Sequence, residues 1–242
     1  MFKKTNTKSK PRVYIDGDRV IKDFGSRVSD AEKVLNRLNT FQKKAGTVKI
    51  NGYTVMATTS EIARDNPGCL VMPRYDGVVL SELGDDDFKM ALAIVSSWYA
   101  HQLIRAEEQG PGFVHGDLHS RNIIMDKISK KVVFIDALCR EATPKNIWLD
   151  VLLLAISISF RLGTSGTRAI QQILYNDIIK GNHDLKNRKL LIRQFLVLSK
   201  HFFLADKRVR EKAKVITALF ICVVNFMRIM RKREPSPQVS SG

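Results

Sequence analysis

The sequence predicts an α+β protein with two lobes, the first small and rich in β-strands and the second helical. As far as residue 75, short apolar runs alternate with turn signals, which is typical of β-hairpins. From residue 85 onward, apolar side chains recur at helical spacing through most of the chain. A chain of 242 residues is long enough for one sizeable core or two smaller ones, so both lobes can be stable together.

The first lobe is predicted to follow the order strand, strand, helix, strand, strand, strand. Asp16-Gly17 joins two short apolar runs and Asn51-Gly52 joins two more, so each pair of runs predicts a hairpin. Between the hairpins, Ser29 and Glu32 have the spacing of a capping box at the start of an amphipathic helix. A last short strand is expected at residues 70–72, immediately before a proline.

The second lobe is predicted to be mainly helical. Apolar residues repeat at helical spacing from Asp85 to Gly110, which ends the first helix. Two short strands are expected around residues 123–125 and 132–134. Further helices are predicted over residues 146–162, 167–180, 185–204 and 207–232.

This change of pattern sets the predicted boundaries. Residues 1–75 form the first lobe, of which residues 1–11 are expected to be flexible, and residues 76–232 form the helical lobe. The hinge between the lobes is expected near Pro73–Gly77. Residues 233–242 form a polar tail, because they lack the apolar residues that packing requires.

The chain is strongly basic. Its 40 Lys and Arg residues outnumber 24 Asp and Glu residues, giving a net charge of +16, so its field attracts anions. A nucleotide, an acidic protein and an anionic lipid or lipopolysaccharide are all compatible partners, and so is a merely solvated basic surface. No motif predicts specific nucleic-acid binding, and a monomer is expected.

The cysteines and the N-terminal segment indicate the compartment. The three cysteines are too few and too scattered for a disulfide framework or a zinc site, which favours a reducing compartment. They are Cys69, Cys139 and Cys222. The N-terminal segment MFKKTNTKSKPR lacks the apolar core of a Sec signal peptide, so the protein is expected in the cytoplasm or exported into a host cell by another route. The apolar stretches 151–160 and 215–227 are too short to span a membrane and predict buried helices.

A polar segment between the predicted strands carries the chemistry. It runs His115-Gly116-Asp117-Leu118-His119-Ser120-Arg121-Asn122, and the apolar run after it ends at Asp136. Phosphoryl transfer needs one carboxylate to orient or deprotonate the acceptor hydroxyl, and oxygen ligands to hold the magnesium ions of the nucleotide. Asp117 is the candidate base, and Asn122 and Asp136 are the candidate magnesium ligands.

The segment resembles the catalytic loop of protein-kinase-like enzymes, H-x-D-x-x-x-x-N, with the metal-binding aspartate downstream. It is most similar to the H-G-D variant of bacterial kinases, small-molecule phosphotransferases and minimal effector kinases. The resemblance is specific between Val114 and Asp136. It implies the bilobal protein-kinase-like fold, with ATP and Mg²⁺ as cofactors.

The resemblance also implies roles for residues outside the loop. Lys22 would bind the α- and β-phosphates, and Glu32 would form its ion pair, although a capping role explains Glu32 equally well. The hinge segment from Met72 to Tyr75, with Met72 and Arg74 as its named candidates, would bind the adenine edge through its backbone. Asp150 would brace the catalytic loop from a buried helix.

The sequence departs from the family pattern at several points. No G-x-G-x-x-G precedes Lys22, so the Asp16-Gly17 turn or the basic N-terminal arm is expected to cover the phosphates. Gly116 replaces the arginine that in many protein kinases contacts a phosphorylated activation loop. Only 13 residues separate Asp136 from Asp150, which leaves little room for such a loop. Activity is therefore expected without loop phosphorylation.

The sequence leaves the phosphate acceptor open. Only residues 76–114 lie between the hinge and the catalytic loop, which predicts an open cleft and a protein acceptor, as in the minimal Ser/Thr effector kinases that pathogens use in virulence. Lipopolysaccharide sugar kinases and other small-molecule kinases can be equally compact, so an anionic small molecule is the alternative. A catalytically dead kinase-like binding module is a remote third.

Two further patterns have more than one interpretation. His115-x-Asp117-x-His119 could be a metal triad of a hydrolase, but that leaves Lys22 and Asn122 without a role. At the end of the last predicted helix, cations either complement the helix dipole or form a docking patch for an acidic protein or an anionic membrane. They are Arg228, Arg231, Lys232 and Arg233.

Overall fold

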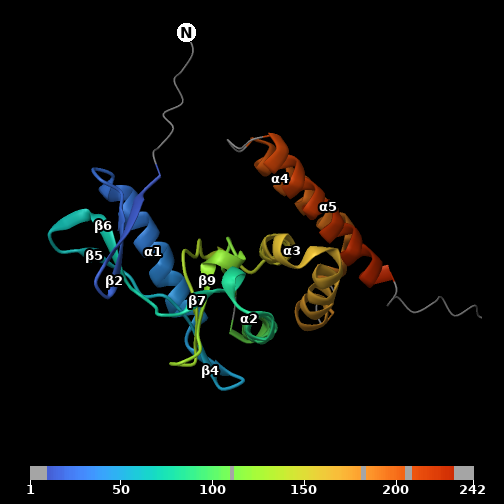
Figure 1. Ribbon diagram of the computed structural model, residues 1–242, viewed down its shortest axis with the longest axis horizontal. Coiled ribbons are helices and arrows are strands. Elements are labelled where there is room, and N and C mark those ends of the chain that lie inside the picture. The colour runs from blue at the N-terminus through green and yellow to red at the C-terminus, as the bar shows by residue number, and fades with distance from the viewer. Residues whose placement is uncertain (1–9, 110–111, 181–183, 205–208, 232–242) are drawn as a thin grey trace, which may run out of the picture.

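The computed structural model describes residues 10–109, 112–180, 184–204 and 209–231. It has a β-rich part with one helix and a helical part, as the sequence predicts. Figure 1 shows the first strands and helix α1 at one end of the molecule, and helices α3, α4 and α5 at the other. The segment that carries the catalytic motif lies between them, so both parts can contribute to one site.

The first sheet has four antiparallel strands in the order β1-β2-β6-β5. They are β1 (Arg12–Asp16), β2 (Arg19–Asp23), β5 (Glu61–Ala63) and β6 (Asn66–Pro73). The predicted first hairpin is confirmed, and Gly17 at its turn has a φ of 58°. Helix α1 (Val28–Ala45) covers this sheet through a small apolar cluster that includes Phe24, Ala31 and Leu70.

The second sheet has five strands in the order β3-β4-β10-β9-β7. They are β3 (Val48–Ile50), β4 (Tyr53–Ala57), β7 (Val78–Val79), β9 (Ile123–Asp126) and β10 (Lys131–Phe134). The Asn51-Gly52 hairpin is confirmed, with positive φ at both turn residues. Its β4 strand does not join the first sheet, however. It pairs in parallel with β10, where the fully buried Val55 and Val132 lie opposite each other.

The helical part is built from three long helices and α2, which precedes the catalytic segment. Their bounds are α2 (Asp85–Gln109), α3 (Pro144–Leu174), α4 (Arg188–Leu204) and α5 (Val209–Arg231). The predicted break near residues 163–166 is wrong, because α3 is continuous and passes into a π-turn over Tyr175–Ile179. Packing holds the second half of α3 in place: Gln171 is fully buried and donates a hydrogen bond to the Cys222 carbonyl of α5 at 3.0 Å.

Short elements complete the chain around the catalytic segment. Strand β8 (Phe113–Val114) leads into it and pairs with β11 (Arg140–Glu141), which follows Asp136. The 3-10 turns are η1 (Leu80–Glu82), η2 (Ser120–Asn122) and η4 (Asp184–Lys186). The β8–β11 pair therefore brings the two ends of the catalytic region side by side.

An aromatic cluster supports the catalytic segment from below. The ring centroids of Trp98 and Phe134 lie 4.3 Å apart, and Phe41 contacts Trp98 at 6.0 Å and His115 at 5.5 Å. These rings come from α1, α2, β10 and the catalytic segment, and all four are essentially inaccessible to solvent. The cluster thus joins both lobes next to the site. Each aromatic pair stabilises the fold by about 0.5–1.5 kcal/mol beyond the burial of its surface area.

Helix α5 is apolar but only partly covered. By length and composition it could cross a membrane: residues Ala213–Arg231 have a mean hydropathy of 1.8, and 33% of that window is buried. Its inner face packs on α3, with the Trp148 and Phe226 rings 5.3 Å apart. The expectation of a buried helix is therefore correct for the inner face only. Core helices of soluble proteins pass the same test of length and composition.

Candidate active site

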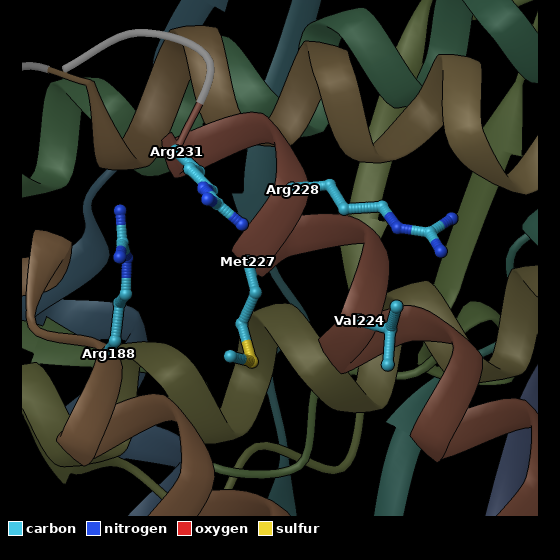
Figure 2. Close-up of a pocket in the computed structure, with 5 residues that line it drawn as sticks. All are labelled: Arg188, Val224, Met227, Arg228 and Arg231. Carbon is cyan, nitrogen blue, oxygen red and sulfur yellow. The ribbon is translucent and has the colours of Figure 1, made fainter. Parts of the chain in front are cut away.

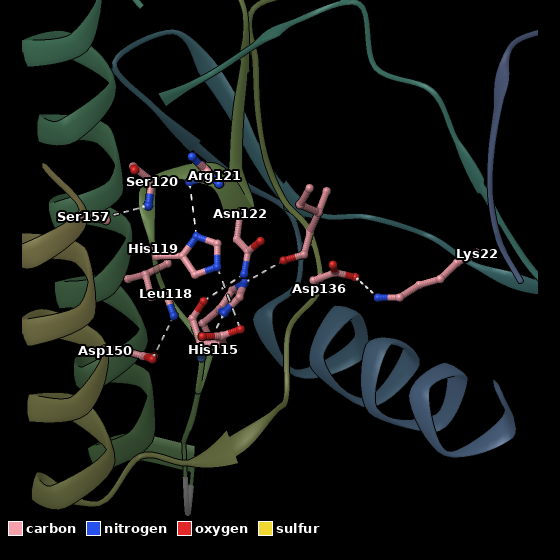
Figure 3. Close-up of polar contacts among 12 residues, drawn as sticks. Lys22, His115, Leu118, His119, Ser120, Arg121, Asn122, Asp136, Asp150 and Ser157 are labelled. Carbon is pink, nitrogen blue, oxygen red and sulfur yellow. Dashed lines mark hydrogen bonds and ion pairs between the residues drawn. The ribbon is translucent and has the colours of Figure 1, made fainter. Parts of the chain in front are cut away.

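Asp150 holds the catalytic loop from helix α3. Its carboxylate accepts hydrogen bonds from the backbone amides of Gly116 (2.9 Å) and Leu118 (3.1 Å) and from the Tyr99 hydroxyl (3.0 Å). Figure 3 shows Asp150 on α3 directed at the loop. The side chain is fully buried, and this burial raises the pKa of Asp150 to about 6 despite the three donors. The bracing arrangement expected from the sequence is present.

His115 ties the loop to the segment that carries Asp136. Its Nδ1 accepts a hydrogen bond from the Asp117 amide at 3.3 Å, and its Nε2 lies 2.9 Å from the Ile135 carbonyl, to which it must donate. The ring is therefore a neutral Nε2–H imidazole, and burial lowers its pKa to about 4. Since both nitrogens have partners in the protein, His115 cannot serve in a metal triad, which removes the hydrolase alternative.

Asn122 is oriented with its oxygen available to a metal. Its side-chain nitrogen donates to the Asp117 carbonyl at 3.0 Å, which fixes which end of the amide is nitrogen. Its backbone carbonyl accepts from the Ile135 amide at 3.0 Å, so the residue is held at both ends. Oδ1 is left as an oxygen ligand of the kind that Mg²⁺ prefers.

Lys22 and Asp136 meet across the two parts of the fold. The Lys22 Nζ on β2 lies 2.8 Å from Oδ1 of Asp136, which follows β10 (Figure 3). The lysine side chain is 16% exposed and the aspartate 42%, so the pair lies at the edge of solvent. Asp136 has a φ of 55°, a left-handed conformation that is uncommon outside glycine and typical of functional sites. A cation and a carboxylate are thus placed where a metal–phosphate group could bridge them.

Glu32 is not brought to this site, contrary to the prediction. It is exposed on α1, and among the described residues the ion pair of Lys22 is with Asp136. The predicted capping box is also absent. Helix α1 begins at Val28, so Ser29 lies inside it, and the residue at its N-cap, Arg27, makes no side-chain cap. The capping-box spacing predicted the helix correctly but misplaced its first residue.

Asp117 is open to an acceptor. Its side chain is 42% exposed, and the Nε2 atom of His119 lies 3.9 Å from its Oδ2. His119 is held locally, because its Nδ1 accepts from the Arg121 amide at 3.3 Å. The geometry leaves a carboxylate beside the magnesium-ligand candidate Asn122 and facing solvent, as a base or orienting group requires.

Within the predicted hinge, residues 72–75, some backbone groups are already paired in the first sheet. The Arg74 amide donates to the Asp18 carbonyl at 2.8 Å and is not available to a nucleotide. Met72 pairs with β2 and has a buried side chain. Because backbone groups of an antiparallel strand alternate between its two sides, the carbonyl of Pro73, the last residue of β6, is directed to the side opposite the Arg74 amide. It is the better candidate for the adenine edge.

Arg140 is a site residue that the sequence did not indicate. Its side chain lies over Gly116, whose φ is 82°, so a Cβ at that glycine would come within 2.8 Å of the arginine Cγ. Arg140 thus lies over Gly116, which is the position at which many protein kinases carry an arginine. No sequence motif links Arg140 to Gly116. The two residues come together because β8 pairs with β11 in the folded protein.

Candidate magnesium ligands are limited to Asn122 and Asp136. Within the described ranges, no group of three or more His, Cys, Asp or Glu side chains forms a metal cluster. Two oxygen ligands suit Mg²⁺, which keeps several waters and takes its remaining ligands from substrate phosphates. These two residues therefore fit a metal that arrives with the nucleotide.

The stability of the protein should depend on pH through His115 and Asp150 in opposite directions. Folding lowers the pKa of His115 from 6.5 to about 4, so protonation of this ring favours the unfolded state. Through His115 the protein therefore loses stability as the pH falls from about 6.5 to about 4. Folding raises the pKa of Asp150 from 3.8 to about 6, so ionisation of this carboxyl favours the unfolded state. Through Asp150 the protein therefore loses stability as the pH rises from about 3.8 to about 6. Each difference corresponds to about 3 kcal/mol.

Substituting each residue should expose the contribution of the other. We expect Asp150→Asn to lose more stability than the wild type when the pH falls from 6.5 to 4.5, because only the His115 effect remains. His115→Gln should lose less than the wild type over the same range. Melting temperatures measured at several pH values test this, and profiles parallel to that of the wild type would contradict it.

Comparisons with known proteins identify the fold. No protein-family model matches the chain, and no curated protein is similar to it in sequence. Among solved structures, an aminoglycoside phosphotransferase from Streptomyces rimosus, in complex with ADP and streptomycin, superposes with a TM-score of 0.51 at 12% identity. The match covers 86% of this chain and 88% of that one.

Two other kinases superpose less closely. A choline kinase from Streptococcus pneumoniae has a TM-score of 0.46 at 10% identity, covering 88% of both chains. A microcompartment-associated aminopropanol kinase has a TM-score of 0.47 at 13% identity, covering 91% of this chain and 89% of that one. At such identities a likeness concerns the fold alone. The superposition on the aminoglycoside phosphotransferase, with the lobes and catalytic loop described above, shows that this chain has the bilobal protein-kinase-like fold.

Proposed function

We propose that the protein is an ATP- and Mg²⁺-dependent phosphotransferase that moves the γ-phosphoryl group of ATP to a hydroxyl group of a small molecule. The observation that carries this proposal is the 2.8 Å contact between Lys22 and Asp136, beside a loop that holds Asp117 and Asn122. A lysine, two magnesium-ligand candidates and an exposed carboxylate are the groups that phosphoryl transfer uses.

Each residue has one role in this proposal. Lys22 neutralises charge on the α- and β-phosphates, while Asn122 and Asp136 hold the magnesium that arrives with ATP. Asp117 orients the acceptor hydroxyl and takes its proton as the oxygen–phosphorus bond forms and the bond to the β-phosphate oxygen breaks. Asp150 and His115 fix the loop, so these groups need little rearrangement when substrates bind.

A small-molecule acceptor is favoured over the protein acceptor expected from the sequence. That expectation depended on the short segment between hinge and catalytic loop. The aminoglycoside phosphotransferase that this chain matches over 88% of its length is nevertheless in complex with streptomycin, so a chain of similar extent can hold a small molecule. The basic composition and the exposed Arg121 and Arg140 near Asp117 favour an acceptor that carries negative charge.

Binding and transfer assays test the proposal in sequence. Isothermal titration with ADP should show binding that weakens when Mg²⁺ is removed. Incubation with γ-labelled ATP and a fractionated cell extract should then label a small-molecule fraction. Glu32→Gln, which lies outside the site, is the matched control and should behave as the wild type does. Label in protein bands alone would favour the protein-kinase alternative, and failure to bind nucleotide would overturn both.

A further inference from the structure

Apart from the active site, the structure has a pocket between helices α4 and α5. It has a volume of about 420 Å³ and lies where α4 begins and α5 ends. Figure 2 shows Arg188 on α4 across from the end of α5, where Met227 and Arg231 lie. The complete lining is Arg188, Val224, Met227, Arg228 and Arg231.

The pocket is positively charged. Its lining holds three guanidinium groups and no carboxylate. Arg228 and Arg231 are exposed. In the part of the chain that the structure describes, no acidic side chain forms an ion pair with either of them. Guanidinium groups bind phosphate oxygens with paired hydrogen bonds, so an anionic phosphate group suits this lining.

Exposed apolar residues follow the pocket on both helices. On α4, Ile192 and Leu196 follow Arg188 by four and eight residues and so share its face, and they are 41% and 59% exposed. On α5, Phe220 precedes Arg228 by eight residues and is 57% exposed. The Phe195 and Phe220 rings lie 6.3 Å apart, so the two helices run side by side here. We call Ile192, Leu196, Val197 and Phe220 the α4–α5 apolar face.

This face lacks a cover among the described residues. Only 33% of the apolar window of α5 is buried, although its mean hydropathy is 1.8. Adjoining apolar residues rimmed by cations are typical of surfaces that lie in the interface of an anionic bilayer. In such a bilayer the lipid phosphates lie next to the ends of the acyl chains. The arginine pocket would correspond to the phosphates and the apolar face to the acyl chains.

We propose that the pocket and the α4–α5 apolar face together bind an anionic membrane. The pocket receives the phosphate of a lipid headgroup, and Leu196 and Phe220 reach the acyl-chain boundary. Charge favours a lipid over a second copy of this chain, because two molecules of net charge +16 repel each other. The proposal goes beyond phosphate transfer and does not depend on it.

Vesicle flotation tests the proposal. The full-length protein should bind phosphatidylcholine vesicles that contain phosphatidylglycerol, and bind pure phosphatidylcholine vesicles much less. Arg228→Glu with Arg231→Glu should lower the affinity about thirtyfold or more, since each basic residue contributes about 1 kcal/mol at an anionic surface. Leu196→Ser with Phe220→Ser should also weaken binding. The matched control, Lys33→Glu with Arg37→Glu, makes the same charge change at exposed positions on α1.

Melting temperatures and a soluble probe separate the alternatives. An unchanged melting temperature with lost vesicle binding supports the proposal. Equal losses in the α1 control would show attraction by net charge alone and overturn it. A lower melting temperature with vesicle binding intact would mean that the arginines only complement the helix dipole. Binding of inorganic pyrophosphate without vesicle binding, abolished by the arginine reversals, would mean a soluble phosphate site and no membrane contact.

Discussion

Replacing Asp117 with alanine should abolish phosphate transfer and leave nucleotide affinity nearly unchanged. The carboxylate is 42% exposed and faces the space where an acceptor would lie, so its loss removes the group that orients and deprotonates the hydroxyl. Loss of a general base typically lowers the rate by about 10²–10⁴-fold. Because the Asp117 carbonyl and amide remain, the bonds to Asn122 and His115 persist and the loop should keep its shape.

Replacing Asp136 with alanine should abolish transfer by a different route. This carboxylate is the candidate magnesium ligand that also pairs with Lys22, so the variant should lose the magnesium-dependent part of its nucleotide affinity. Titration of ADP with and without Mg²⁺ distinguishes the two variants, and single-turnover assays measure transfer. Wild-type turnover in either variant would show that its residue has been assigned the wrong role.

The catalytic loop was predictable because its signal is local. Asp117 and Asn122 are joined by a hydrogen bond within the loop itself, and Asp136 closely follows a strand that pairs with the strand after the loop. The hairpins were predictable for the same reason, since the turn at Asn51-Gly52 needs the positive φ that these residue types adopt. In each case the residues that determine the geometry lie within a few positions of one another.

Features set by distant contacts were not predictable in this way. The β3–β4 hairpin could pair with either sheet, and only burial of Val55 against Val132 decides for the second. Helix α3 continues through residues 163–166, where the local sequence favours a break, because Gln171 and its neighbours pack on α5. Tertiary packing here outweighs the roughly 1 kcal/mol of helix propensity that each glycine costs.

The same limit explains why Glu32 was wrongly placed at the site and why Arg140 was missed. Glu32 had a suitable residue type and position, but its side chain lies on the exposed side of α1. Arg140 has no motif, yet β-pairing brings it over Gly116. Residue type and spacing identify candidates, whereas the direction of a side chain depends on how whole elements pack.

Replacing Lys22 with methionine should lower phosphate transfer by about 10²–10³-fold, the loss typical when one electrostatic group is removed from a transition state. Methionine keeps most of the side-chain length and removes the charge beside the phosphates. The fold should survive, because methionine fills most of the volume of the 16% exposed Lys22 side chain and Asp136, at 42% exposed, stays hydrated without its partner. Circular dichroism and melting temperature check the fold, and γ-labelled ATP measures transfer.

Glu32→Gln is the informative companion to this variant. If the exposed position of Glu32 holds in the working enzyme, its activity should equal that of the wild type, whereas a glutamate that pairs with Lys22 during turnover would lose activity when neutralised. Equal losses in both variants would mean that α1 moves when nucleotide binds, so that Lys22 exchanges Asp136 for Glu32. Full activity in Lys22→Met would instead show that the 2.8 Å contact with Asp136 is structural, and that another cation binds the phosphates.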